Sequence, residues 1–90
     1  MAPITIPTLL FWENKNSWYG SKGNARFFIR PVFPGKDEEP FPPYLETELW
    51  RGPLSRQLSE IITTVTFPLG EEGLEQTVAW LEEQAALLNA

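Results

Sequence analysis

The C-terminal segment, residues 66–90, constrains the fold more than any other part of the chain. Its apolar residues recur at spacings of four, three, four and three: Leu74, Val78, Leu81, Ala85 and Leu88. At about 100° per residue these positions form one continuous stripe on a helix. Glu71 and Glu72 precede the stripe, and carboxylates interact favourably with a helix N-terminus. A single helix of this kind must bury its stripe, and only the preceding sequence can cover it.

Most of the preceding sequence has strand character. Residues 25–33 and 44–51 alternate between two sets of side chains, which is typical of strands with one buried face. Residues 59–67 are rich in β-branched side chains, which favours a third strand. The short apolar run TLLFW, residues 8–12, is interpreted as a further strand, which resumes at residues 17–19 after a turn.

Glycine and proline divide these segments. Residues 20–24 (GSKGN) are predicted to form a turn, because their two glycines can adopt positive φ. Two prolines in residues 1–7 would interrupt a central strand, so this segment is predicted to be an N-terminal arm or an edge strand. Residues 34–43 contain four prolines and are predicted to form an exposed loop, with Phe41 as its only large apolar side chain.

This order of elements predicts one α+β domain over residues 1–90. The expected architecture is an antiparallel β-meander of three to four strands with one C-terminal α-helix packed on one face. The predicted core beneath the helix consists of Phe27, Ile29, Leu45, Leu49, Ile61, Val65 and Phe67. The opposite face is predicted to carry Arg26, Arg30, Glu46, Glu48, Glu60, Ile62 and Thr64. Opposite charges on neighbouring strands of that face are expected to pair.

The composition excludes most catalytic chemistry. The chain has no histidine and no cysteine, which removes the commonest general base, the commonest zinc ligand and all thiolate sites. The acidic run at residues 37–39 lacks the alternating spacing of a calcium loop, and residues 20–23 lack the complete phosphate-loop pattern. The helix glutamates have no predicted burial that would separate their pKa values. We therefore predict a non-catalytic protein without a metal or other cofactor.

No apolar run approaches the about 18 residues that a membrane span needs, and no basic segment precedes an apolar one as in a signal peptide. The absence of cysteine fits a reducing compartment. We therefore expect a cytoplasmic protein that does not associate with membranes.

The charge is unevenly distributed. The net charge is −5, all seven basic residues lie in residues 1–56, and residues 57–90 contain six acids and no base. Direct nucleic-acid binding is disfavoured, because phosphate contacts need clustered Lys and Arg. An acidic surface would instead attract a protein partner with a basic surface. The alternative is that the negative surface only keeps a small protein soluble.

On a helical wheel Glu72, Glu75, Glu82 and Glu83 form one acidic face with no interleaved base. Like charges three or four residues apart repel by a few tenths of a kcal/mol, so a face of one sign indicates a binding surface.

Trp80 and Leu87 lie off the apolar stripe, at about 240° and 220° from Leu74. They are either covered by a wide helix–sheet contact or exposed as anchors for a partner or a second copy of the chain. The same alternatives apply to four other aromatic residues: Trp18, Tyr19, Phe41 and Trp50.

The chain resembles the compact inhibitors carried by phages and mobile elements, anti-CRISPR proteins among them. The resemblance is one of type: small size, the acidic segment from Glu71 to Glu83, and no enzyme motif. It implies a steric or electrostatic mechanism, in which the acidic helix face occupies a basic groove that normally receives nucleic acid and partly imitates its phosphates. The alternative function is a structural or accessory homo-oligomeric protein of a phage or bacterium that pairs through exposed Trp80 and Leu87.

Overall fold

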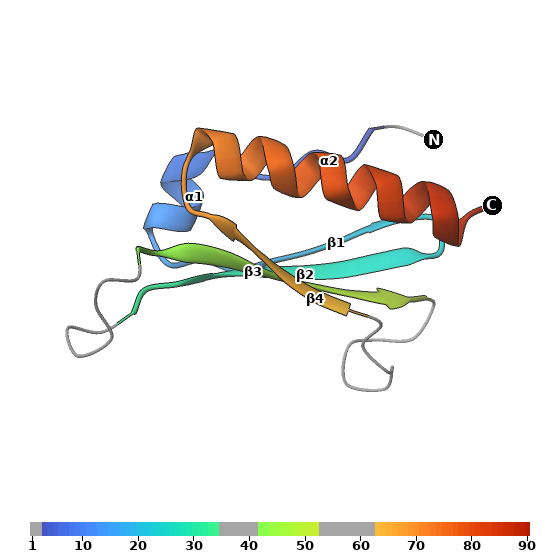
Figure 1. Ribbon diagram of the computed structural model, residues 1–90, viewed down its shortest axis with the longest axis horizontal. Coiled ribbons are helices and arrows are strands. Elements are labelled where there is room, and N and C mark those ends of the chain that lie inside the picture. The colour runs from blue at the N-terminus through green and yellow to red at the C-terminus, as the bar shows by residue number, and fades with distance from the viewer. Residues whose placement is uncertain (1–2, 35–41, 53–62) are drawn as a thin grey trace.

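The computed structural model describes residues 3–34, 42–52 and 63–90. The elements along the chain are α1 (Leu9–Glu13), β1 (Trp18–Lys22), β2 (Ala25–Val32), β3 (Tyr44–Arg51), β4 (Thr63–Pro68) and α2 (Glu71–Leu88). The four strands form one antiparallel sheet in the order β1-β2-β3-β4, and α2 covers one of its faces (Figure 1). The predicted α+β fold, a β-meander with a C-terminal helix on one face, is confirmed.

Strand alternation sorts the two faces of the sheet as predicted. Phe27, Ile29, Leu45 and Leu49 are buried on one face, together with the stripe residues Leu74, Leu81 and Ala85 of α2. Val65 and Phe67 are only half-buried, because β4 is an edge strand. On the opposite face Arg30 Nη2 lies 2.9 Å from Glu46 Oε1, which confirms the expected pairing of charges. Glu60, Ile61 and Ile62 lie outside the described residues.

The interpretation of residues 8–12 as a strand is wrong, because Leu9–Glu13 forms the short helix α1. Trp12 is fully buried, and its Nε1–H donates a hydrogen bond to the Pro7 carbonyl at 2.9 Å. Phe11 packs edge-to-face on Trp12 and on Trp18, at centroid distances of 4.9 and 6.0 Å. A short apolar run is compatible with a helix or a strand, and here the burial of one large ring decides between them.

The predicted turn at residues 20–24 is too long. β1 continues to Lys22, and only Gly23 and Asn24 form the turn to β2. Gly23 has the positive φ of 60° that a tight hairpin requires, whereas Gly20 lies within the strand. A Cβ at Gly20 would come within 2.4 Å of Phe27 Cζ, so this glycine makes room for the Phe27 ring.

Residues 3–8, which we call the arm, have no regular secondary structure. Ile4 is nonetheless buried and belongs to the core, and Ile6 packs against the same cluster. Of the proline-rich segment 34–43, residues 35–41 with Phe41 lie outside the described residues, and Pro42 and Pro43 are exposed.

Candidate partner-binding surface

Helix α2 is attached to the sheet at both of its ends. At its first turn, Gly73 packs so closely on the end of β4 that a Cβ there would lie 1.6 Å from the Pro68 carbonyl oxygen. After its last turn, Asn89 Oδ1 accepts a hydrogen bond from the Asn24 N–H at 2.8 Å, and Asn89 Nδ2 donates to the Lys22 carbonyl at 2.9 Å. The side chains of α2 are therefore held at fixed positions relative to the sheet.

Four carboxylates of α2 are exposed and form the surface that we call the acidic face: Glu71, Glu72, Glu75 and Glu83. The ion pairs among residues 3–34, 42–52 and 63–90 are Lys22–Glu82 and Arg30–Glu46. None of the four carboxylates of the acidic face therefore has a basic partner within the described part of the chain. Arg26 and Arg30 lie on the sheet face opposite α2, so they do not dilute this negative surface.

Glu82 does not belong to the acidic face, although the sequence groups it there. Its Oε2 lies 2.6 Å from Lys22 Nζ of β1, and its Oε1 accepts a hydrogen bond from the backbone N–H of Ile4 in the arm. Glu82 thus joins α2, β1 and the arm within the chain. The sequence contains no local signal for this contact, because Glu82 is separated from its two partners by 60 and 78 residues.

The hydrogen bond from the Ile4 N–H, together with the Lys22 ammonium, lowers the pKa of Glu82 below its ordinary value of 4.5. A carboxyl group with a lowered folded-state pKa stabilises the fold above its unfolded-state pKa. That contribution disappears as the pH falls through the lower, folded-state pKa. We therefore expect Glu82→Gln to be less stable than wild type near neutral pH, and the difference to shrink as the pH falls below 4.5.

Urea unfolding of both proteins over a series of pH values measures this difference. Glu83→Gln is the matched control. Glu83 is the next residue in the chain, and its exposed carboxylate has no ion-pair partner among the described residues. The control should stay within about 0.5 kcal/mol of wild type at every pH. A gap between wild type and Glu82→Gln that stays constant with pH would show that the carboxylate charge does not hold the arm.

A hollow of about 490 Å³ adjoins the acidic face, between the arm and α2. Its α2 side is formed by Leu74, Val78 and Ala79, with Glu71 and Glu75 also lining it. The arm contributes residues 5–8. An aliphatic stem that ends in a positive charge fits this combination, because the stem can cover apolar atoms while the charge meets carboxylates. Lys and Arg side chains have this form.

The two predicted aromatic and aliphatic anchors differ in their surroundings. Trp80 is half-buried against the core, with its ring centroid 6.2 Å from that of Phe67, whereas Leu87 is 66% exposed. Trp50 is buried, while Trp18 and Tyr19 are exposed. Trp80 therefore belongs to the wide helix–sheet contact, and Leu87 is the exposed member of the pair.

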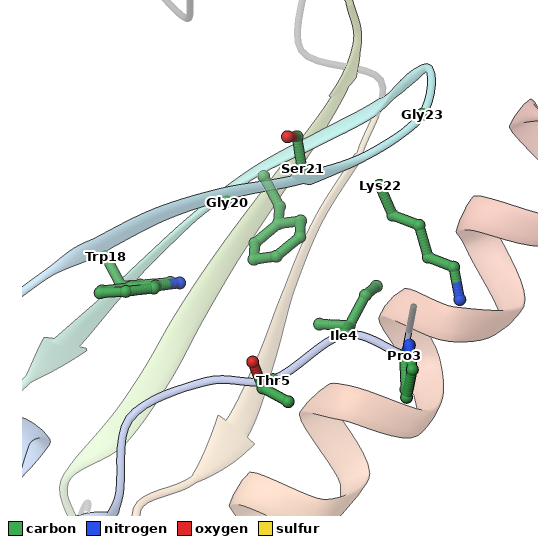
Figure 2. Close-up of a pocket in the computed structure, with 9 residues that line it drawn as sticks. Pro3, Ile4, Thr5, Trp18, Gly20, Ser21, Lys22 and Gly23 are labelled. Carbon is green, nitrogen blue, oxygen red and sulfur yellow. The ribbon is translucent and has the colours of Figure 1, made fainter. Parts of the chain in front are cut away.

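A second cavity, of about 420 Å³, lies between the arm and β1 (Figure 2). Pro3, Ile4 and Thr5 line one side, and Trp18 and residues 20–23 line the other. Lys22, its one charged lining residue, extends toward α2 (Figure 2). Its ammonium forms an ion pair there with Glu82. The cavity thus offers hydroxyl groups and apolar surface.

Across residues 3–34, 42–52 and 63–90, no three acidic side chains are grouped so that they could hold a metal ion. In the same described part of the chain, no helix combines the length and the apolar character needed to cross a membrane. The absence of cofactors and a cytoplasmic location stay predictions from the sequence.

The chain matches no protein-family model, no curated protein and no solved structure.

Proposed function

We propose that this protein is a non-catalytic inhibitor that covers a basic, nucleic-acid-binding surface of a partner protein with the acidic face of α2. The observation that carries the proposal is the set of four exposed carboxylates that have no basic partner among the described residues. Unpaired charges of one sign attract a surface of the opposite sign and increase the rate of association.

The spacing of the carboxylates supports competition with nucleic acid. From Glu71 to Glu75 the helix rises about 6 Å, so this part of the acidic face presents three carboxylates at a mean spacing of about 3 Å, and Glu83 follows about 12 Å further along. One strand of a nucleic acid presents one phosphate per about 3.4 Å of helix axis. The first turn of the acidic face therefore approximates the charge density of one strand of a duplex, enough to occupy part of a basic groove.

The attachment of α2 at both ends also supports binding. Gly73 and Asn89 fix the two ends of the helix, so little conformational entropy is lost when the acidic face meets a partner. The hollow beside Glu71 and Glu75 adds a place for one Lys or Arg side chain of the partner. Phage inhibitors of nucleic-acid-handling complexes, such as anti-CRISPR proteins, are the class that this mechanism fits, and such a protein acts in the cytoplasm.

The test is a competition assay against nucleic-acid-handling complexes, including RNA-guided nucleases, each loaded with a labelled oligonucleotide. Wild-type protein should displace the oligonucleotide from its target complex, and displacement should weaken as salt is raised. The variant Glu72→Lys/Glu75→Lys/Glu83→Lys should compete at least about 100-fold less well. Each reversed charge is expected to cost about 1 kcal/mol, and the total of about 3 kcal/mol corresponds to slightly more than a 100-fold loss of affinity.

Two single variants distinguish the effect of the acidic face from the effect of net charge on competition. Glu75→Lys lies on the acidic face, whereas Glu13→Lys changes the charge equally at an exposed position at the end of α1. Only Glu75→Lys should reduce competition substantially. Equal losses would mean that net charge alone matters, and competition that survives all the reversals would overturn the proposal.

A further inference from the structure

The two edges of the sheet, β1 and β4, differ in what lies beside them. Beside the β1 edge, the arm lies between β1 and α2 (Figure 2). There the Ile4 N–H donates a hydrogen bond to Glu82, and Glu82 forms an ion pair with Lys22. At the other edge is β4, and no described strand pairs with its outer side. None of its six residues, TTVTFP, is charged, and its one proline, Pro68, lies at the last position of the strand. Charged side chains are one of the commonest ways in which proteins keep an edge strand from pairing with another chain.

Two backbone hydrogen bonds show which groups of β4 point outward. The Leu69 N–H donates to the Pro43 carbonyl, and the Gly52 N–H donates to the Asn24 carbonyl. Along an antiparallel strand the backbone groups of successive residues point alternately to the two neighbouring strands. Counted from these two bonds in the observed registers, the backbone groups of Val65 and Phe67 point toward β3. Thr64 and Thr66 therefore direct their N–H and C=O groups away from the sheet.

The hydrophobic core is also less well covered along this edge. Val65 and Phe67 are half-buried, whereas Ile29, Leu45 and Leu49 of the central strands are at most 1% exposed. Trp80, which packs on Phe67, is half-buried as well. A hollow of about 510 Å³ opens beside Phe67, with Pro43, Tyr44 and Thr66 also in its lining. A further strand at this edge would cover apolar atoms as well as satisfy backbone groups.

We propose that β4 pairs antiparallel with β4 of a second copy of this chain, across a two-fold axis at Val65, to form a continuous eight-stranded sheet. In this register Thr64 of each copy exchanges two backbone hydrogen bonds with Thr66 of the other. Val65 then lies directly opposite Val65 of the second copy, and Phe67 lies opposite Thr63. The segment is complementary to itself, as a two-fold interface requires.

A second copy can occupy this edge, because β4 carries no charge that would repel another β4. Each chain carries a net charge of −5, so two copies can associate only through a surface that keeps their carboxylates apart. In the proposed register Glu46 and Glu48 on β3 lie three strand spacings, about 14 Å, from their counterparts, which exceeds the about 8 Å screening length at physiological salt. The carboxylates of Glu71 and Glu75 line the hollow on the arm side of α2, on the helix flank away from Trp80. The interface does not depend on the proposed function.

Cysteine cross-linking tests the register directly, because the chain has no cysteine of its own. Directly opposite residues at a pair without mutual hydrogen bonds have Cα atoms about 4.5 Å apart, which is within the range that a disulfide spans. Val65→Cys should therefore form a disulfide-linked dimer under mild oxidation. Thr63→Cys, on the same strand, is the matched control, since its counterpart would lie four residues along the strand, about 13 Å away. It should remain uncross-linked.

The oligomeric state of cysteine-free variants gives the second measurement. Thr66→Pro removes an outward N–H without removing a bond to β3, so the chain should stay folded by circular dichroism while the dimer dissociation constant rises at least about 100-fold. Thr66→Val keeps the N–H and should leave the dimer unchanged. Wild type that is monomeric at about 1 mM by sedimentation equilibrium would overturn the proposal. So would a dimer that survives Thr66→Pro, or one that dissociates only in Leu87→Ala, which would place the contact on α2.

Discussion

Trp12→Ala is expected to lower the free energy of unfolding by about 3–5 kcal/mol, the range seen when a fully buried aromatic side chain is truncated. The Trp12 ring is completely buried in the core, and its Nε1–H binds the Pro7 carbonyl at 2.9 Å. The substitution would leave a cavity between α1 and the sheet and would leave the Pro7 carbonyl without this donor. Since small domains are stable by only about 5–15 kcal/mol, a large part of the protein would be unfolded at moderate urea concentrations.

Urea unfolding followed by far-ultraviolet circular dichroism measures this loss without relying on tryptophan fluorescence. Leu10→Ala is the matched control in the same helix, because Leu10 is 67% exposed, and it should stay within about 0.5 kcal/mol of wild type. Trp12→Phe, which keeps an aromatic ring but has no N–H, should lie between the two. A loss below about 1 kcal/mol for Trp12→Ala would contradict the placement of α1 in the core.

Gly73→Ala has the next largest expected effect on stability. It should lower the free energy of unfolding, whereas helix propensity alone would raise it. In an exposed helix interior, alanine in place of glycine gains about 0.5–1 kcal/mol. Here the new Cβ would lie 1.6 Å from the Pro68 carbonyl oxygen and 2.7 Å from its carbonyl carbon, both of which are backbone atoms. The first turn of α2 would have to move away from β4, which we expect to cost about 1–3 kcal/mol.

The same unfolding assay tests this prediction. Gln76→Ala, one turn further along α2 and exposed, has no such contact, and it should change the stability by less than about 0.5 kcal/mol. If Gly73→Ala were more stable than wild type, the close approach of α2 to β4 would be wrong, because propensity alone would then decide the result.

The competition assay and the cross-linking experiment address function and association independently of these two stability measurements. A dimer through β4 would carry two acidic faces, so a partner with two basic sites could be bound by both copies at once. The two results can nevertheless differ, because the acidic face and the β4 edge share no residue.

The short-range patterns of the sequence determined the fold class and the two faces of the sheet. Phe27 and Ile29 in β2 and Leu45 and Leu49 in β3 are buried because side chains alternate at a period of two, whatever lies above them. Leu74, Leu81 and Ala85 of the stripe face the sheet for the equivalent reason at a period of 3.6. These periodicities depend only on neighbouring residues, so they can be recognised in the sequence alone.

Tertiary structure alone decided the features that depend on contacts between distant segments. Residues 9–13 form a helix because the Trp12 ring is buried against the sheet. Glu82 does not belong to the acidic face because it binds Lys22 and the Ile4 N–H, which lie 60 and 78 residues away in the sequence. The exposure of the β4 edge likewise follows from strand order. In each case the energy comes from burying side chains and pairing polar groups between segments that are in contact only in the folded protein. Local sequence patterns do not predict such contacts.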